Sequence, residues 1–503
     1  MLTIDVLPHL QQDEVQITDY GRLALDPQSN WSVTWLVEEA KPLLLWSYLG
    51  PLIAELSFQI GGISGLGPRV ASLVGGIFAA SMVFGWLTSR KVATYAAFGL
   101  GVAFLLDPLF VLSQRMGRVD AWVIGCCLAS CWLLRLARHR NGNVYIAVAG
   151  GMAAVAAFIW PSAIFLYPLI IMELFLVSSE KAFNGRVKVW FRKAVFFGLG
   201  GIITSLFLLL PIRNSLELIF SDMGSMVAQN IDSTKTIQDQ IFALFNHEHW
   251  LKLAKVYIKT LSPFFVILAL VAIVLRKGKG PILAFLVSMA IVFASLVYEF
   301  RALYLIPYFV LIISGLYHKA ATTGQGRKQF FRKFSIVFLI LWSIGISLIL
   351  RTIMGFENKD ELNRNKLSRM AKATIGEGEY KVFLNYTYEL YFAGRSLGWK
   401  IYTPYIQYAN DTNGNWIKNT AYEQDPAFKE LLSQMDFAFF TEGSVSEVLE
   451  KQLTSAGLHL VNDQGLIKGE ISSAIEGIGR NQEMILWFLR GKETYGSYVL
   501  YKR

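Results

Sequence analysis

The stretch LSQRMGRVDAW, residues 112–122, places two arginines and an aspartate between two strongly apolar runs. Arg115 and Arg118 supply guanidinium groups, which bind phosphate through paired hydrogen bonds, and Asp120 adds a carboxylate. A second acidic feature precedes the apolar runs, where Asp13 and Glu14 are adjacent. Arginines at a helix end can also act only as anchors that reach the headgroups, and an acidic pair can be a solvated face. The side of the membrane on which these residues lie decides between the two interpretations.

The composition defines the class of protein. Hydrophobic residues make up 54% of the 503 residues and charged residues 17%, which is typical of a polytopic membrane protein and not of a soluble domain. The formal net charge of +10 comes from basic residues that cluster in short loops between apolar runs. Such clustering reflects membrane topology, so nucleic-acid binding is not indicated.

Apolar runs of spanning length recur along the chain. The run from 144 to 177 contains one charge, Glu173, and is too long for a single helix. A tight hairpin is predicted at Trp160-Pro161, because proline ends or kinks the preceding helix. Since each span needs about 20 apolar residues, we predict about ten spans, at 68–88, 92–113, 119–137, 144–160, 162–178, 194–213, 256–275, 281–298, 302–318 and 334–352.

The loops between these spans alternate in charge. Lysine and arginine concentrate at 90–91, 135–140, 181–193, 276–279 and 319–333. Basic loops stay in the cytoplasm, so the residues before the first span, the loops at 107–118, 214–255 and 299–301, and the tail after Met354 are predicted to face outward. Arg115 and Arg118 therefore lie outside, against the charge bias, and ionisable residues near a membrane face are often functional.

The two ends of the chain differ from the apolar middle. The tail combines alternating segments such as KVFLNYTYELYF and DFAFFTEG with helix-like ones such as SVSEVLEKQL, which predicts a soluble α/β domain. The expected organisation is an outer loop with interfacial helices at 1–67, a transmembrane region at 68–353 and an extracytoplasmic α/β domain at 354–503. For the outward N-terminal segment, either the chain inserts with this end outside or an eleventh helix precedes Met1.

Short motifs occur in one order along the chain: D-E at 13–14, K-P-L-L-L-W from Lys41, G-I-S-G-L-G-P-R-V at 62–70, S-Q-R-M-G-R-V-D at 113–120 and F-R-A-L-Y-L-I-P-Y at 300–308. Over roughly residues 8–318 the chain resembles the GT-C glycosyltransferases that use polyprenyl-phosphate sugars, especially the protein O-mannosyltransferase and lipid A aminoarabinose transferase branch. It departs from them in four places. The aromatic residue often found just after D-E is absent, and Tyr20 arrives later. K-P-P is K-P-L, R-P-D is Arg118-Val119-Asp120, and no transmembrane helix precedes the D-E pair.

The resemblance implies roles for the outward polar residues. Asp13 is expected to act as the general base, with Glu14 as the second choice. The donor phosphate is expected to bind Lys41, Arg115, Arg118 and Arg301, because fixed cations stabilise the charge that develops on a leaving phosphate. Asp120 is expected to orient an arginine or to bind a sugar hydroxyl, and Tyr304 to contact the substrate. No cofactor is implied, and no metal site is predicted, since His247 and His249 alone are a poor ligand geometry; a divalent metal stays open.

The expected activity is transfer of a sugar from a polyprenyl-phosphate donor to a protein, lipid or glycan acceptor, with inversion, at the outer face of the cell (inner) membrane. One alternative is a transporter or a flippase for lipid-linked sugars. Transporters usually contain two related halves with interrupted helices near the midplane, and no internal repeat is evident here. A second alternative is a scaffold that binds partners through its tail.

The predicted topology can be tested at Ser444, in the tail. The native cysteines, Cys126, Cys127 and Cys131, all lie in one apolar run. We therefore expect a membrane-impermeant thiol reagent to label Ser444→Cys in intact cells, and the parent protein to remain unlabelled. Labelling only after lysis would place the tail in the cytoplasm and reverse the side of every predicted site residue.

Overall fold

The computed structural model describes residues 3–4, 6, 12–26, 28–33, 47–62, 66–138, 142–177, 183–216, 244–275, 279–293, 297, 299–318, 327–360, 362–385, 387–403, 408–410, 416–418, 426–461 and 498–503. The chain divides into two compact units. The helical unit comprises Pro42–Gly50 and Ala71–Leu350, and the mixed unit comprises Met1–Lys41, Pro51–Val70 and Arg351–Arg503. The mixed unit thus joins most of the segment 1–67 with the tail, two stretches that were predicted as separate domains.

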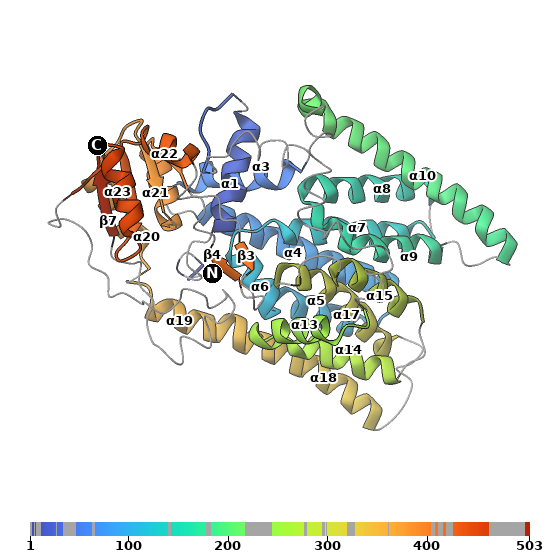
Figure 1. Ribbon diagram of the computed structural model, residues 1–503. Helices are drawn as coiled ribbons and strands as arrows, with labels where there is room; N and C mark the ends of the chain where they lie inside the picture. The colour runs from blue at the N-terminus through green and yellow to red at the C-terminus, as the bar shows by residue number, and fades with distance from the viewer. Residues whose placement is uncertain are drawn as a thin grey trace. The chain divides into compact units, whose positions relative to one another are not determined.

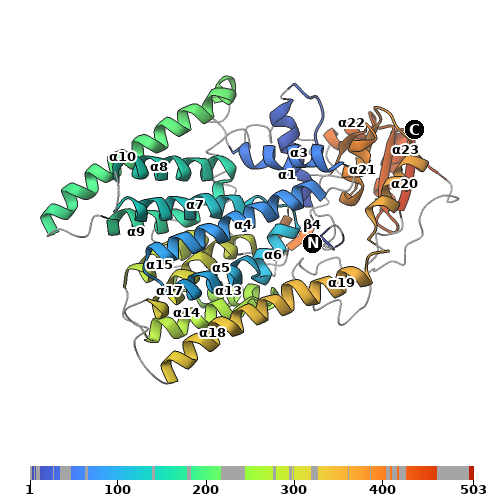
Figure 2. The ribbon, with the colours of Figure 1, turned by 180° about the vertical axis from the view of Figure 1, so that it is seen from behind.

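The helical unit consists of apolar helices, of which α7, α8 and α9 run side by side in Figures 1 and 2. Helix α8 packs between α7 and α10, and α17 packs against α14, α15 and α5. The elements are α4 (Leu66–Ser89), α5 (Thr94–Leu105), α6 (Pro108–Arg115), α7 (Asp120–Leu136), α8 (Gly142–Ile159), η2 (Pro161–Leu166), α9 (Tyr167–Val177), α10 (Phe183–Leu209), η3 (Leu210–Ser215), α13 (His247–Lys259), α14 (Pro263–Leu275), α15 (Lys279–Phe293), α16 (Glu299–Ala302), η4 (Leu303–Leu305), α17 (Ile306–Ser314), η5 (Gly315–Tyr317), α18 (Arg327–Ile344) and the π-helical η7 (Gly345–Leu350).

The predicted count of ten spans is not confirmed. Among the described residues, 5 helices are long and apolar enough to cross a membrane, or 6 if a bent pair counts as one span. Other predicted spans fold as shorter helices, such as α7 with 17 residues and α14 with 13. Proline and capping residues divide the apolar runs more finely than hydropathy alone indicates. The predicted break at Trp160-Pro161 is confirmed, because α8 ends at Ile159 and η2 begins at Pro161.

Glu173, the single charge in the run from 144 to 177, is fully buried in α9. It forms ion pairs with Arg90 and Arg135 and accepts a hydrogen bond of 3.0 Å from the indole nitrogen of Trp86. A buried carboxylate is tolerated when it is paired and hydrogen-bonded. Glu173 therefore joins α9 to α7 and to the end of α4.

Glycines allow α8 and α10 to approach closely. A Cβ atom at Gly200 in α10 would lie 1.9 Å from the carbonyl oxygen of Ala147, and one at Gly150 in α8 would lie 1.9 Å from that of Phe197. Neither distance is compatible with a side chain. Small residues in this arrangement let two helix backbones pack directly against each other, which is typical of helices in membranes.

The mixed unit contains α1 (Gln12–Leu25), most of α3 (Leu49–Gly61), α19 (Arg351–Glu357) and the α/β tail. Its five-stranded sheet has the order β2-β1-β5-β7-β6, in which β2, β1 and β5 are parallel and β7 and β6 are antiparallel. The tail elements are α20 (Arg364–Thr374), β1 (Lys381–Leu384), η8 (Tyr388–Leu390), α21 (Tyr391–Ser396), β2 (Lys400–Tyr402), β3 (Tyr408–Asn410), β4 (Trp416–Lys418), α22 (Pro426–Leu432), β5 (Phe437–Thr441), α23 (Glu447–Ser455), β6 (His459–Leu460) and β7 (Tyr498–Lys502).

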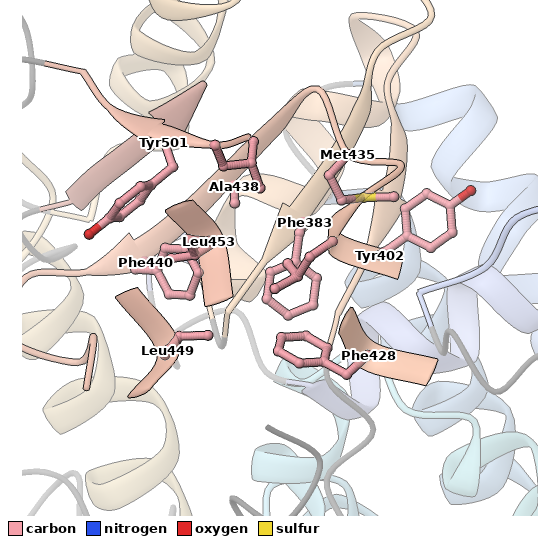
Figure 3. Packing of buried hydrophobic residues seen from close by; sticks show 11 residues of the cluster. Phe383, Tyr402, Phe428, Met435, Ala438, Phe440, Leu449, Leu453 and Tyr501 are labelled. Carbon is pink, nitrogen blue, oxygen red and sulfur yellow. The ribbon is translucent and has the colours of Figure 1, made fainter. Parts of the chain in front are cut away.

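The parallel strands β1, β2 and β5 are largely buried on both faces, as parallel strands usually are, whereas β6 at the edge is exposed. Phe383 of β1 and Phe440 of β5 point into a core with side chains from α22 and α23, including Phe428 and Leu449 (Figure 3). On the opposite face, the ring of Phe439 stacks on Trp399 with 6.3 Å between ring centroids. The α/β character predicted for the tail is confirmed by these strands and helices.

The close contact of α8 and α10 can be tested by comparing two glycines of α10. We expect Gly200→Leu to lower the unfolding temperature in detergent, because the side chain would force the helices apart, at a cost typical of overpacking of about 1–3 kcal/mol. Gly198→Leu is the matched control, since a Cβ atom there meets nothing within 4 Å. Equal unfolding temperatures for the two variants would contradict the packing of α8 on α10.

Candidate functional site

A break between α5 and α6 positions the RMGRVD segment. The two helices meet at an angle of 49°, and Asp107, between them, accepts hydrogen bonds from the N–H groups of Leu109 and Phe110 at 3.0 and 3.1 Å. This N-cap starts α6 in a new direction. Ser262, just before α14, donates a hydrogen bond to the same carboxylate. The short helix α6 is therefore fixed at its beginning and presents Arg115 at its end.

A tight reversal then returns the chain to α7. Gly117 has φ of +62°, a conformation that favours glycine, and the N–H of Arg118 donates to the carbonyl oxygen of Ser113 at 3.3 Å. The hydroxyl of Ser72 in α4 donates to the carbonyl oxygen of Arg118 at 2.5 Å. Asp120 is the first residue of α7. The turn thus places Arg118 and Asp120 next to each other on a rigid support.

Asp120 accepts hydrogen bonds from side chains of three segments. Its Oδ2 accepts from Nε of Arg118 at 2.7 Å and from the hydroxyl of Ser113 at 3.2 Å, and its Oδ1 accepts from the hydroxyl of Tyr304 at 2.7 Å. Asp120 is 1% exposed and Tyr304 is fully buried. The predicted proximity of Asp120 to an arginine is therefore observed, and its carboxylate orients both Arg118 and Tyr304.

Arg118 is held on its other side by an aromatic ring. Its guanidinium carbon lies 3.8 Å from the centroid of Phe300, which itself packs with Leu112 and Met116. A guanidinium stacked on a ring and paired with one carboxylate is a pre-organised cation. Phe300 and Ser113 were not predicted as site residues, although Phe300 lies directly beside Arg301 in the F-R-A-L-Y motif.

The other predicted phosphate ligands differ in their placement. Arg115, at the end of α6, and Arg301, in α16, are both buried, with exposed fractions of 8% and 9%. Arg115 follows Ser113 in α6, and Arg301 directly follows Phe300 in α16. Lys41 lies outside the described residues. Within the described ranges, histidine, cysteine, aspartate and glutamate form no group of three that could hold a metal ion.

The acidic pair lies in the first turn of α1, in the mixed unit. Glu14 is fully buried and forms a two-oxygen ion pair with Arg69, at 3.0 Å to Oε1 and 2.9 Å to Oε2. Arg69 also donates to the carbonyl oxygen of Ile4 at 2.8 Å. Arg69 belongs to the G-L-G-P-R-V motif but was not predicted as a site residue. Asp13 is only partly buried, so the two adjacent acids have different surroundings.

The predicted site residues thus form two groups, each within one unit. Arg118, Asp120 and Tyr304 are brought together in the helical unit, with Ser113 and Phe300 as further members. Asp13 and Glu14 lie in the mixed unit, with Arg69 as the partner of Glu14. Tyr304 and Asp120 are 184 positions apart in the sequence, and Arg69 and Glu14 are 55 positions apart. No local pattern in the sequence indicates these two contacts.

Comparison with solved structures shows that this chain has a GT-C fold. The solved structure of ArnT from Cupriavidus metallidurans bound to undecaprenyl phosphate matches it with a TM-score of 0.52 and 10% identity, over 99% of this chain and 95% of that chain. The likeness extends through the α/β tail and confirms the GT-C fold that the motifs predicted. The branch of GT-C proteins stays a prediction.

Two further solved structures are similar at a lower level. ArnT from the same organism in the apo state has a TM-score of 0.48 and 11% identity, over 91% of this chain and 92% of that chain. Arabinofuranosyltransferase AftD from Mycobacteria has a TM-score of 0.49 and 11% identity, over 100% of this chain and 40% of that chain. No protein-family model and no curated protein matches the sequence.

The two acids of the D-E pair can be separated by their effect on stability. We expect Glu14→Gln to lower the unfolding temperature strongly, because Arg69 would remain buried without its counter-charge, a loss of about 3–5 kcal/mol for a broken buried pair. Asp13→Asn should lower the unfolding temperature less than Glu14→Gln does, because Asp13 is only partly buried. Thermal unfolding of the purified variants in detergent measures both, and a stable Glu14→Gln protein would remove the buried pair as a structural element.

Proposed function

We propose that this protein is a membrane glycosyltransferase that moves a sugar from a polyprenyl-phosphate donor to an acceptor at the outer face of the membrane. The observation that carries this proposal is the GT-C fold along the whole chain, because the ArnT that shares it was solved with undecaprenyl phosphate bound. The buried Arg118 cluster adds a cation of suitable chemistry. The acceptor is a protein, a lipid or a glycan that carries a nucleophilic group.

Arg118 is assigned to the donor phosphate. Displacement of a sugar from a lipid phosphate increases the negative charge on the leaving oxygens, and a cation that is already oriented stabilises this charge without reorganisation. The side chain of Arg118 is held by Asp120 and Phe300, and its backbone carbonyl is held by Ser72. Asp120 then acts by orienting Arg118 and Tyr304, the first of the two roles expected for it. Lys41, Arg115 and Arg301 are assigned as further phosphate ligands.

Asp13 is assigned as the general base that accepts the proton of the acceptor. The base must be able to reach the proton of the acceptor, and both carboxylate oxygens of Glu14 already accept hydrogen bonds from Arg69. Asp13 keeps partial exposure and is therefore preferred over Glu14. Attack from the face opposite the phosphate gives inversion at the anomeric carbon in a single displacement.

A transporter or flippase for lipid-linked sugars is the alternative, since it would also bind a polyprenyl phosphate. The two activities differ in their product. A glycosyltransferase releases the polyprenyl phosphate and forms a new glycosidic bond, whereas a flippase returns the intact donor. Sugar-linked lipids that accumulate in cells lacking the protein identify the donor to be used in either assay.

The roles of Asp13 and Arg118 can be separated by measuring binding and turnover independently. We expect Asp13→Asn to reduce turnover by about 10²–10⁴-fold and to bind undecaprenyl phosphate like the parent protein. Arg118→Ala should weaken both, with binding reduced by about tenfold or more, because a charge-assisted hydrogen bond contributes about 1.5–3 kcal/mol.

Tyr304→Phe is the matched control for Arg118→Ala. It removes another donor to Asp120 at 2.7 Å but keeps the cation, so binding of undecaprenyl phosphate should be largely retained. If Tyr304→Phe weakens binding as much as Arg118→Ala does, Arg118 acts through the integrity of the cluster and not through the phosphate. Unchanged turnover in Asp13→Asn would remove Asp13 as the base.

A further inference from the structure

The sheet of the mixed unit has a topology that normally creates a ligand site. In open α/β sheets, ligands bind beyond the carboxyl ends of the strands, where the chain connections diverge to opposite sides. Here that point is the end of β1, because its parallel neighbours β2 and β5 lie on either side of it. The contacts of the residues that follow the parallel strands therefore show what lies at the carboxyl ends of these strands.

The chain's own N-terminal segment occupies this edge. Thr403, directly after β2, donates from its N–H and its hydroxyl to the carbonyl oxygen of Val33, at 2.8 and 2.7 Å. Tyr391, which begins α21 after β1, donates its hydroxyl to Oδ1 of Asp19 in α1 at 3.2 Å. Positions that would contact an external ligand in a doubly wound domain here contact residues 19 and 33.

A second link joins α21 to α3. Arg395 forms a two-oxygen ion pair with Glu55, at 2.6 Å to Oε2 and 2.9 Å to Oε1, and also donates to the hydroxyl of Tyr391 at 3.3 Å. Its guanidinium carbon lies 4.8 Å from the ring centroid of Phe58, which packs on Phe392 at 5.0 Å. The side chains of Glu55 and Tyr391 are fully buried.

Asp19 connects Tyr391 to several residues of the N-terminal segment through hydrogen bonds. Besides Tyr391, it accepts from Nε of Arg22 at 2.8 Å, from the hydroxyl of Ser32 at 2.7 Å and from the N–H of Val33 at 3.1 Å. Burial raises the pKa of Tyr391 well above its usual value, so its hydroxyl stays protonated and remains a donor. One buried carboxylate thus links α1 to residues 32 and 33, which follow it.

We propose that the C-terminal α/β domain is a positioning element for α1, and that Tyr391 and Arg395 are the positioning residues. They hold α1 and α3 in one orientation and so set the place of Asp13, six residues before Asp19. A buried ion pair adds little net stability. Loss of one partner is nevertheless strongly destabilising, because it leaves an unpaired charge inside the protein. The consequence for sugar transfer rests on the proposed function; the structural role does not.

The experiment compares Arg395→Ala, Tyr391→Phe and the control Lys372→Ala in the full-length protein. Lys372 pairs with Glu377 in the same domain, but both side chains are 64% exposed, and such pairs contribute little. We expect faster amide hydrogen exchange in α1 for Arg395→Ala and, less strongly, for Tyr391→Phe, and no change for the control. Turnover should fall by about 10²-fold in Arg395→Ala, as for a misplaced catalytic group, with binding of undecaprenyl phosphate unchanged.

A reversed pair separates positioning from a general loss of folding. Glu55→Arg combined with Arg395→Glu keeps opposite charges at the two positions, and we expect it to restore part of the protection of α1 that each single change removes. Unchanged exchange in α1 for both Arg395→Ala and Tyr391→Phe would overturn the positioning role. Absence of transfer by the parent protein would instead overturn the proposed function, because the exchange result does not depend on it.

Discussion

Charged side chains that leave water must be neutralised inside the protein, and this requirement decides how the segments of this chain meet. Transfer of an unpaired charge into an apolar interior is far more costly than any single packing contact. Five groups of ion pairs with a buried carboxylate satisfy the requirement among the described residues: Glu14 with Arg69, Asp19 with Arg22, Asp120 with Arg118, Glu173 with Arg90 and Arg135, and Glu55 with Arg395. In three of them the partners come from different helices. Each such pair therefore favours one relative placement of its two helices, which apolar packing alone specifies less strictly.

The same requirement separates structural charges from those available for chemistry. The carboxylate of Asp120 receives three donors, which makes it a fixed acceptor and turns Arg118 into an oriented cation. An arginine suits this place better than a lysine, because Nε can pair with the carboxylate while the plane of the guanidinium stacks on Phe300. The guanidinium of Arg118 is thus held in one orientation by Asp120 and Phe300. Pre-organisation of this kind is the main source of electrostatic stabilisation in enzymes.

Local patterns in the sequence predicted the local features and missed the distant pairings. Period-two segments predicted β1 and β5, Trp160-Pro161 marked the end of α8, and the closeness of Arg118 and Asp120 followed from a separation of two residues. The bonds from Tyr304 to Asp120 and from Tyr391 to Asp19 span 184 and 372 residues, and neither periodicity nor composition encodes such distances. The ten predicted spans are not confirmed, because several apolar runs contain shorter helices in the described residues. Asp107 caps a new helix within an apolar run, and a hydropathy window cannot register this effect of one polar residue.

The D-E pair and the G-L-G-P-R-V motif are far apart in the sequence but meet in the fold. Arg69 lies near the start of α4, and its ion pair with Glu14 joins the two motifs. Adjacent acids on a helix point in directions about 100° apart, so one can face a buried arginine while the other keeps access to solvent. Glu14 thus anchors α1 to Arg69, while Asp13 beside it keeps partial exposure.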